Sequence, residues 1–232
     1  MAASTIVITE EIQDRFDEIE RLLDAEYGPR LLRPNEDPLS TLIGTILSQS
    51  TSDVNSSRAM EFLRSEFPTW EEVRDAPVEE VIDAIRPGGL ANTKGPRIQA
   101  VLHAITEEQP SLDLGFLADR SVEDAMAWLT DLQGVGPKTA ACVLIFALGM
   151  PAMPVDTHVG RVMSRIGIFP DRTSTATKQR ILEELIGPNP QRVYAVHVET
   201  ISHGRQVCTA RNPKCSTCPL LEHCDYGQSR VG

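Results

Sequence analysis

Four of the five cysteines are concentrated in the last 25 residues of this 232-residue chain. They follow the spacing C-x6-C-x2-C-x5-C in CTARNPKCSTCPLLEHC and are Cys208, Cys215, Cys218 and Cys224. Disulfides are disfavoured, because the first residues contain no secretory signal. Zinc accepts four thiolates, but structural zinc sites usually use two separated C-x2-C pairs. One compact loop with four thiolates favours an iron–sulfur cluster, whereas Cys142, in an apolar run, is expected to be a buried hydrophobic residue.

A second candidate site is the segment LQGVGPKTAACVLIFALG at residues 132–149. Gly134, Val135 and Gly136 are expected to form a tight hairpin, with Pro137 in the first turn of the next helix. Backbone amides near residues 134–138 could then bind an anion at a helix N-terminus, and a DNA phosphate binds such a site without sequence reading. Lys138 directly follows this turn. It is either a reactive amine or an ordinary first-turn surface lysine.

The elements that would position these residues are predicted to be helices throughout. Residues 9–26 have a helical stripe of apolar residues after Thr9 as N-cap, Asp37 or Ser40 is expected to start the next helix, and Asp53 a third. Proline and glycine separate the remaining segments. Further helices are expected near 70–76, 78–86, 94–108, 121–131, 138–149, 156–167, 174–187 and 190–203. The fold class is therefore all-α, with non-bundle packing of many short helices.

These motifs together resemble those of the endonuclease III family of helix–hairpin–helix DNA glycosylases. The resemblance covers roughly residues 35–225 and rests on LQGVGPKTA, VDTHVGRV at 155–162, HGRQVC at 203–208 and the cysteine loop, in the order found in the family. It implies that Lys138 is the nucleophile and Asp156 the second catalytic group. It also implies that the four cysteines hold a [4Fe–4S] cluster, with His203 and Arg205 as structural support around it; His158 also belongs to a matched motif.

The chemistry implied by this resemblance needs an amine and a carboxylate. A neutral lysine amine can attack C1′ of the sugar and form a Schiff base, which releases the damaged base while the enzyme keeps hold of the DNA. A carboxylate can stabilise the cationic sugar and then take part in proton transfer. Judged without the resemblance, Lys138 is a surface lysine and Asp156 a helix N-cap. A cap and a catalytic role are compatible for Asp156.

A glycosylase must also open the duplex, because its target atom is hidden inside the base stack. Proteins that work from the minor groove insert side chains into the gap. The family uses a glutamine after an L-S motif and a leucine in a G-L-x-N-x-K loop. Leu90 in GLANTKG matches the second loop, with Lys94 as a candidate phosphate contact. In LSQSTSD, Gln49 lies one place earlier than the family's glutamine and Ser50 takes its position, so either residue could fill the gap.

The net charge of −11 is unusual for a protein that binds DNA. Residues 1–30 hold eight acids and three bases (−5) and residues 61–85 eight acids and two bases (−6), so the remainder is neutral. Residues 86–97 and 201–219 each contain three bases and no acid. We therefore expect an acidic back and a locally basic face. Arg211 and Lys214, inside the first cysteine interval, are candidate DNA contacts.

The resemblance implies two helical domains with a DNA cleft between them: residues 31–150 with the hairpin, and residues 1–30 with 151–232, including the cluster loop at 208–224. The expected function is base-excision repair of oxidised pyrimidines in duplex DNA, with glycosylase and AP lyase activity. We expect a cytoplasmic, nucleoid-associated monomer that binds DNA with a damaged base or an abasic site and does not interact with membranes. The alternatives are a monofunctional mismatch or uracil-type glycosylase, in which another residue usually replaces the lysine, and a non-catalytic DNA-binding module.

Overall fold

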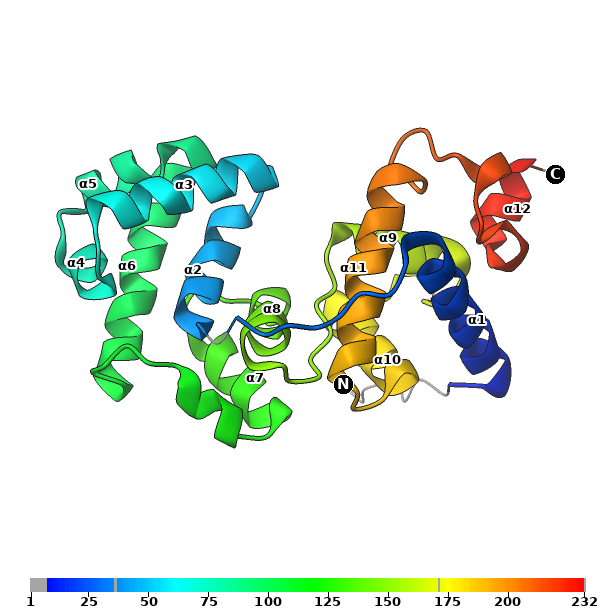
Figure 1. Cartoon of the computed structure of the whole chain (residues 1–232), viewed down its shortest axis with the longest axis horizontal. Coiled ribbons are helices and arrows are strands. Elements are labelled where there is room, and N and C mark those ends of the chain that lie inside the picture. Colours follow the sequence, from blue (N-terminus) through cyan, green and yellow to red (C-terminus); the bar gives the residue numbers. More distant parts are fainter. Residues whose placement is uncertain (1–7, 36, 171, 232) are drawn as a thin grey trace. The chain divides into compact units, whose positions relative to one another are not determined.

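The computed structural model describes residues 8–35, 37–170 and 172–231. Every regular element in these ranges is an α-helix or a short 3-10 helix, so the all-α prediction is confirmed (Figure 1). The chain divides into two compact units, residues 34–150 and residues 1–33 with 151–232. None of the described helices combines the length and apolar character needed to cross a bilayer.

The unit at residues 34–150 contains seven α-helices and two 3-10 helices among its described residues. They are α2 (Pro38–Ser48), α3 (Asp53–Glu66), α4 (Trp70–Asp75), α5 (Val78–Ala84), η1 (Arg86–Gly88), α6 (Ala91–Glu108), η2 (Gly115–Asp119), α7 (Val122–Asp131) and α8 (Pro137–Leu148).

The second unit contains five α-helices and two 3-10 helices among its described residues. They are α1 (Glu10–Tyr27), α9 (Thr157–Ile166), α10 (Thr175–Ile186), α11 (Pro190–Gln206), η3 (Cys215–Thr217), η4 (Leu221–His223) and α12 (Asp225–Val231).

Short polar side chains begin most of these helices. Thr9 caps α1 by accepting the Ile12 amide, and Asp37 caps α2 by accepting the Ser40 amide at 2.9 Å. The expected cap of α3, Asp53, is wrong by one residue. Ser52 has the extended backbone of an N-cap and accepts the Asn55 amide, while Asp53 is the first helical residue, where its charge suits the helix dipole.

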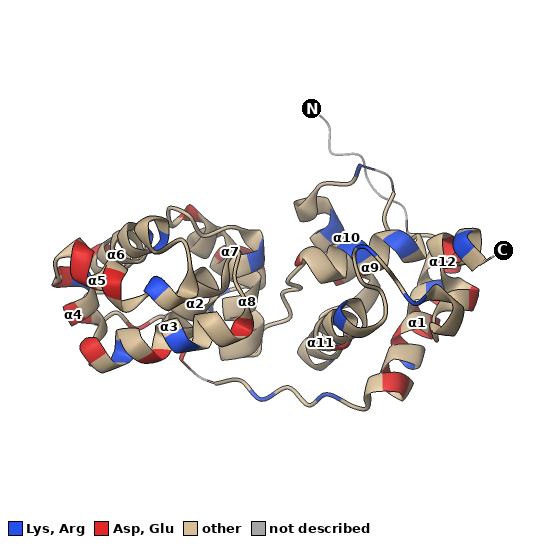
Figure 2. Cartoon of the chain, turned by 90° about the horizontal axis from the view of Figure 1, so that it is seen from above, with Lys and Arg blue, Asp and Glu red and all other residues tan. Residues whose placement is uncertain are grey.

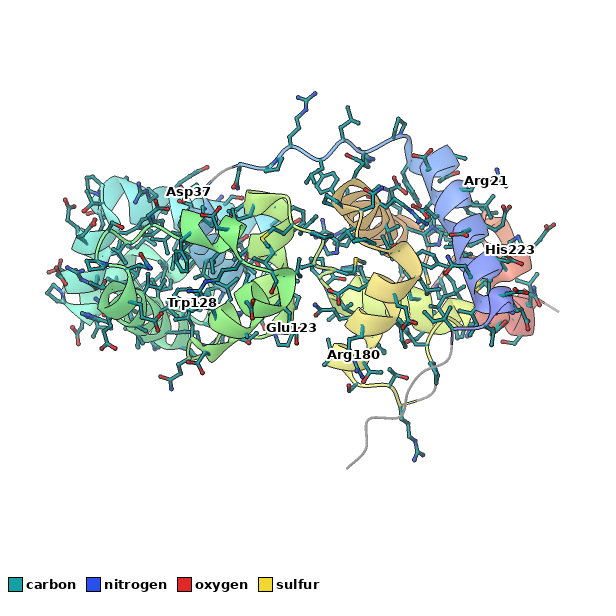
Figure 3. The ribbon with its side chains drawn as sticks, turned by 90° about the horizontal axis from the view of Figure 1, so that it is seen from below. Arg21, Asp37, Glu123, Trp128, Arg180 and His223 are labelled. Carbon is teal, nitrogen blue, oxygen red and sulfur yellow. The ribbon has the colours of Figure 1, made fainter. Side chains whose placement is uncertain are left out.

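The core of the 34–150 unit is built around α2 and α8. These two helices pack against each other more extensively than any other pair, and α2 also contacts α3 and α6 (Figure 1). Helix α8 is apolar nearly all round and α2 contributes one apolar face, so burial of these side chains favours folding of this unit. At the periphery, Trp128 on α7 packs edge to face on Phe116, with 5.2 Å between ring centroids, and donates to Glu108 (Figure 3).

In the other unit, α11 packs against α9 and α1. Each contributes one apolar stripe: Phe16, Ile19 and Leu23 from α1 are fully buried, as are Val159 and Met163 from α9. The ends of α9 and α11 therefore have fixed positions. Both ends matter, because α9 begins next to Asp156 and α11 leads directly into the cysteine loop.

Two elements differ from the sequence predictions. Helix α6 starts at Ala91 rather than near residue 94, because Leu90 adopts a left-handed conformation (φ 51°) and precedes the helix without a side-chain cap. Helix α12, DYGQSRV, was not predicted. It is short, polar and without apolar periodicity, so only its contacts with α9, η3 and η4 explain it.

Candidate active site and iron–sulfur site

The predicted hairpin lies between α7 and α8. Gly134 has φ 86°, a conformation that favours glycine, and Gly136 is the N-cap of α8, followed by Pro137 at the first helical position. Val135 differs from its neighbours. Its side chain is buried and its amide donates to the Leu132 carbonyl at 3.0 Å. We therefore correct the prediction for Val135, which packs and closes the hairpin instead of offering its amide to an anion.

Lys138 is the second residue of α8 and is partly buried. The helix behind it is anchored over its whole length, since Thr139 and the next six residues are all buried. A side chain here lies close to the positive end of the helix dipole. The amine is thus held on a rigid element, directly after the hairpin.

Asp156 is the N-cap of α9, and its Oδ1 accepts the Val159 amide at 2.7 Å. The flanking Val155 and Val159 are buried, which fixes the backbone on both sides of the carboxylate. The predicted capping role of Asp156 is therefore confirmed. Its predicted partner, Lys138, belongs to the other compact unit.

The two loops that are predicted to open the duplex each contain an exposed residue in the left-handed backbone conformation. Gln49 ends α2 and is partly buried, and its Oε1 accepts from Nη1 of Arg97 at 2.9 Å. Ser50 is exposed and left-handed, with φ 54°. Leu90 is also left-handed and 58% exposed. An exposed leucine in strained backbone has no packing function here, so it stays a candidate wedge.

Lys94 requires a correction, because it does not reach the surface as a phosphate contact must. Its side chain is 2% exposed, and Nζ donates to the Leu47 carbonyl at 2.6 Å and to the Gly88 carbonyl at 2.9 Å. Burial lowers the pKa of this amine. Lys94 therefore joins the end of α2 to the loop before Leu90 from inside the protein.

The basic segment at 86–97 consequently does not form a free cationic patch. Lys94 is buried, Arg86 forms an ion pair with Asp83 at 2.6 Å, and Arg97 donates to Gln49. In the same unit, acidic side chains gather on α4 and α5 (Figure 2), as expected from residues 61–85.

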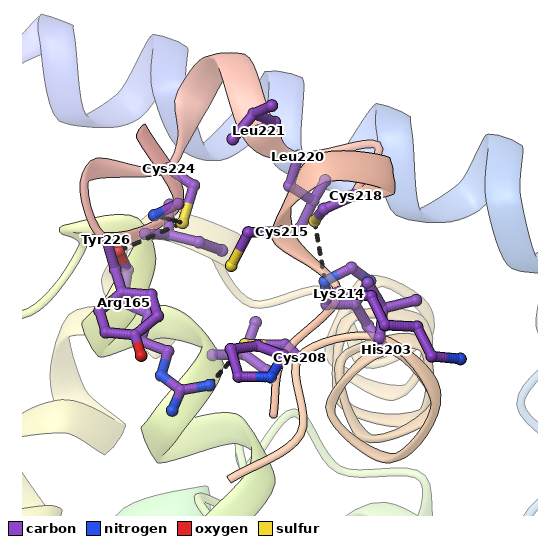
Figure 4. Close-up of a pocket in the computed structure, with 15 residues that line it drawn as sticks. Arg165, His203, Cys208, Lys214, Cys215, Cys218, Leu220, Leu221, Cys224 and Tyr226 are labelled. Atoms are coloured by element: carbon purple, nitrogen blue, oxygen red, sulfur yellow. Dashed lines mark hydrogen bonds between the residues drawn. The ribbon is translucent and has the colours of Figure 1, made fainter. Parts of the chain in front are cut away.

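The four C-terminal cysteines line a single pocket (Figure 4), and none of them forms a disulfide. Burial is the main reason that the pKa of Cys218 is raised to about 11, and neighbouring thiols add to the effect; burial also raises the pKa of Cys224. Thiols with raised pKa values become thiolates only beside a cationic centre. The donor set therefore fits a cluster that contains several iron ions.

Helices α9 and α11 hold this loop in place. From α9, Arg161 donates to the Cys208 carbonyl at 3.0 Å, and Arg165 donates to the Cys208 sulfur at 3.3 Å and to the Thr209 carbonyl at 2.8 Å. From α11, the buried His203 lies 3.5 Å from the Cys218 sulfur through Nε2 (Figure 4).

His203 is itself positioned by Tyr27 of α1, whose hydroxyl shares a 3.1 Å hydrogen bond with Nδ1. Burial lowers the pKa of His203 to about 4 and is the main reason that the pKa of Tyr27 is raised to about 12. Both groups are thus neutral at physiological pH. A neutral imidazole can donate to a thiolate from Nε2 while it accepts from the phenol at Nδ1.

Other predicted residues of this region lie at the surface. Arg211 and Lys214 are exposed within the loop, where they are accessible to a ligand. Arg205 is exposed as well, and its supporting role stays a prediction, whereas His203 and the α9 arginines contact the cysteine loop directly.

Two family models match this chain. The first, described as the HhH-GPD superfamily base excision DNA repair protein, covers residues 43–188, and the second, the iron–sulfur binding domain of endonuclease III, covers residues 208–224. Endonuclease III of Thermotoga maritima is 33% identical over 198 residues, which span 84% of this chain and 85% of the relative. The chain belongs to the endonuclease III family. Its C-terminal loop accordingly binds a [4Fe–4S] cluster, and Cys208, Cys215, Cys218 and Cys224, which line the pocket there, stay its predicted ligands.

Solved structures of endonuclease III resemble this family member closely. A non-covalent endonuclease III–DNA complex matches with a TM-score of 0.80 and 27% identity, over 97% of this chain and 99% of that one. A trapped endonuclease III–DNA covalent intermediate matches with a TM-score of 0.77 and 29% identity, over 98% of this chain and all of that one. The family resemblance seen in the motifs therefore extends to the fold.

Three residues of this endonuclease III relative were given no individual role from the sequence. Arg161 and Arg165 lie four residues apart on one face of α9, and this spacing could have indicated a shared target. Arg97 gave no such signal. Its partner Gln49 is 48 positions away, and only the tertiary structure brings the two together.

Proposed function

We propose that this chain is a bifunctional base-excision-repair enzyme that removes oxidised pyrimidines from duplex DNA and then cleaves the strand as an AP lyase. The observation that carries the proposal is Lys138, an amine fixed directly after the hairpin at the start of α8, in a chain that belongs to the endonuclease III family. The trapped covalent intermediate described for a similar structure is the kind of species that a lysine nucleophile forms.

DNA would first be bound through its phosphates, independently of its base sequence. Gly136 has open space where a side chain would lie, which leaves backbone at the N-terminus of α8 accessible to one phosphate, and the turn there depends on Gly134. The exposed Arg211 and Lys214 supply charge for another phosphate. The [4Fe–4S] cluster contributes structure, because it ties together the loop that carries these two cations.

Base release then follows from attack by Lys138. The neutral Nζ forms a bond to C1′ while the bond from C1′ to the base breaks, and the base leaves with the electron pair and takes up a proton. Asp156 stabilises the positive charge that develops on the sugar and accepts the proton lost from the amine. The C1′–O4′ bond then breaks and O4′ takes up the proton that Asp156 accepted, so the products are a free base and an iminium, the protonated Schiff base, between Lys138 and the opened sugar.

Strand cleavage uses the same covalent intermediate. The iminium makes the C2′ proton acidic; its loss pushes electrons into the sugar and expels the phosphate from C3′, which breaks the strand 3′ to the lesion. Water then hydrolyses the Schiff base and regenerates Lys138.

We further propose that the enzyme acts as a monomer on a lesion or an abasic site. Because its substrate is DNA, we expect it at the nucleoid in the cytoplasm.

The test is a panel of duplexes, each with one lesion, in which base release and strand scission are scored separately. Duplexes with an oxidised pyrimidine should give both products at equal rates, and a preformed abasic site should be cleaved. Base release without scission would favour the monofunctional alternative, and binding without either product would overturn the proposal.

A further inference from the structure

Helix α6 directs two cationic side chains toward the loops that are predicted to open the duplex. Lys94 and Arg97 are three residues apart and therefore lie on one face of the helix. Lys94 holds the main chain, through the carbonyls of Leu47 and Gly88. Arg97 holds a side chain, through the 2.9 Å hydrogen bond to Oε1 of Gln49.

Arg97 also lies against the hairpin. A β-carbon added at Gly134 would lie 2.6 Å from Nε of Arg97 and 2.7 Å from its Cδ, so the arginine side chain occupies the space left by the missing side chain. The glycine at this position therefore serves two purposes. It permits the positive φ of the turn, and it leaves room for Arg97 to pass across the hairpin to Gln49.

We propose that Arg97 is a positioning residue, which links the phosphate-binding hairpin to Gln49 and fixes that glutamine as the side chain that enters the gap left by the flipped nucleotide. This proposal rests on the proposed function, because it assigns a role within the same DNA site. It also distinguishes Gln49 from Ser50, whose exposed position after the end of α2 gives it no comparable support.

The hydrogen bond sets the chemistry that Gln49 presents. A guanidinium only donates, so the atom of Gln49 that faces Arg97 must be the carbonyl oxygen, and the amide nitrogen is left to donate elsewhere. Arg97 is partly buried, and a charge-assisted hydrogen bond of this kind is stronger than one between neutral groups. Gln49 is thus oriented before DNA arrives, which reduces the entropy lost when the gap is filled.

The proposal is tested with a duplex that carries a tetrahydrofuran abasic analogue opposite 2-aminopurine. This probe needs no chemistry at Lys138, and 2-aminopurine fluorescence reports how far the opposite base is unstacked. Binding is measured by anisotropy with wild type, Gln49→Ala, Arg97→Ala, Arg97→Lys and the double alanine variant. Arg120→Ala is the matched control, since Arg120 belongs to the same compact unit and lies over the ring of Phe116.

We expect Arg97→Ala to weaken binding about 10-fold and to lower the fluorescence change, with the double variant no weaker than Gln49→Ala alone. Arg97→Lys, which keeps a donor, should recover part of the signal, and Arg120→Ala should behave as wild type. Additive losses in the double variant would overturn the proposal. The same is true of an Arg97→Ala variant whose only defect is a smaller salt dependence, because that result makes Arg97 a phosphate contact.

Failure of the proposed function gives a different pattern. In that case the wild-type enzyme releases no base from any duplex, whereas the coupling between Arg97 and Gln49 on the abasic analogue is unaffected. If the wild-type enzyme is active but the coupling is absent, the function stands and the role of Arg97 is wrong.

Discussion

The cysteine loop (residues 208–224) and the duplex-opening loops (residues 47–50 and 88–90) are held in the same way, by cationic side chains that reach them from a neighbouring helix. At the cysteine loop, Arg161 and Arg165 reach from α9 to the chain around Cys208. At the duplex-opening loops, Lys94 and Arg97 reach from α6 to the end of α2 and the segment before Leu90. In both places a rigid helix holds irregular chain through long cationic side chains.

The two regions differ in how far apart their parts lie in the sequence. The four predicted cluster ligands fall within 17 residues and are all cysteines, so their spacing alone indicates the cofactor. The duplex-opening site combines residues near 47–50, 88–97 and 134–136. Its chemistry depends on tertiary contacts. We therefore expect the cysteine loop to lose its cluster when a single ligand is removed. In the duplex-opening loops, each substitution should remove only part of the function.

The largest effect expected is loss of the cluster in Cys218→Ala. A missing ligand leaves one iron without its thiolate, and because cluster binding and folding of the loop are coupled, we expect nearly complete loss of iron and of visible absorbance. Cys142→Ala is the matched control, since Cys142 is buried in α8 of the other compact unit. Equal iron content in the two variants would break the assignment of the ligands.

A smaller but still large effect is expected for Asp156→Asn. The amide can still cap α9, so the melting temperature should change little, but base release should fall about 10²–10⁴-fold because the carboxylate is lost. Asp37→Asn alters the cap of α2 in the same way and should keep full activity. Melting curves and single-turnover rates of base release, measured in parallel for both variants, distinguish a catalytic role from a capping role. Equal rates for both variants would reduce Asp156 to a capping residue.

Lys94→Met tests whether Lys94 supports the duplex-opening loops from inside the protein or contacts DNA. The substitution keeps the apolar stem but leaves the carbonyls of Leu47 and Gly88 unpaired, at a cost of about 2–4 kcal/mol in the free energy of unfolding. The slope of log K against log salt for DNA binding should be unchanged. For the exposed Arg211→Ala we expect that slope to fall by about 0.9. A reduced slope for Lys94→Met would restore its role as a phosphate contact.

The smallest effect concerns the unit that holds the cluster. Glu199 of α11 is 1% exposed, and neither of its carboxylate oxygens has a hydrogen-bond partner among the described residues. Burial is the main reason that its pKa is raised from 4.5 to about 7. The charges of Asp24 and Glu20 also raise this pKa, and Arg30 lowers it by less. A raised folded-state pKa means that Glu199 destabilises the fold increasingly as the pH rises from 4.5 to 7.

Glu199→Gln should therefore match wild type at pH 4.5 and exceed it at pH 8 by about 1–3 kcal/mol in the free energy of unfolding. Urea unfolding at a series of pH values measures the difference. Glu123→Gln, at the exposed surface of α7, provides the control and should show no such trend (Figure 3). A stability difference that does not vary with pH would contradict the account of Glu199.

Local patterns predicted the parts of the molecule that depend on neighbours in the sequence. Thr9 and Asp156 were identified as caps because an N-cap needs only the next three residues, and both have that role. Lys94 and Val135 were interpreted less well. Their motifs gave no information on burial, and both prove to be internal. Burial depends on which helices pack together, so it is not encoded within a motif.

Borohydride trapping tests the central claim most directly. Wild-type enzyme incubated with a duplex that contains an oxidised pyrimidine, in the presence of borohydride, should form a stable protein–DNA adduct that maps to Lys138. Lys138→Ala should bind the same duplex with unchanged salt dependence and give no adduct. Equal trapping by both proteins, or an adduct that maps to another residue, would contradict the assignment of Lys138 as the nucleophile.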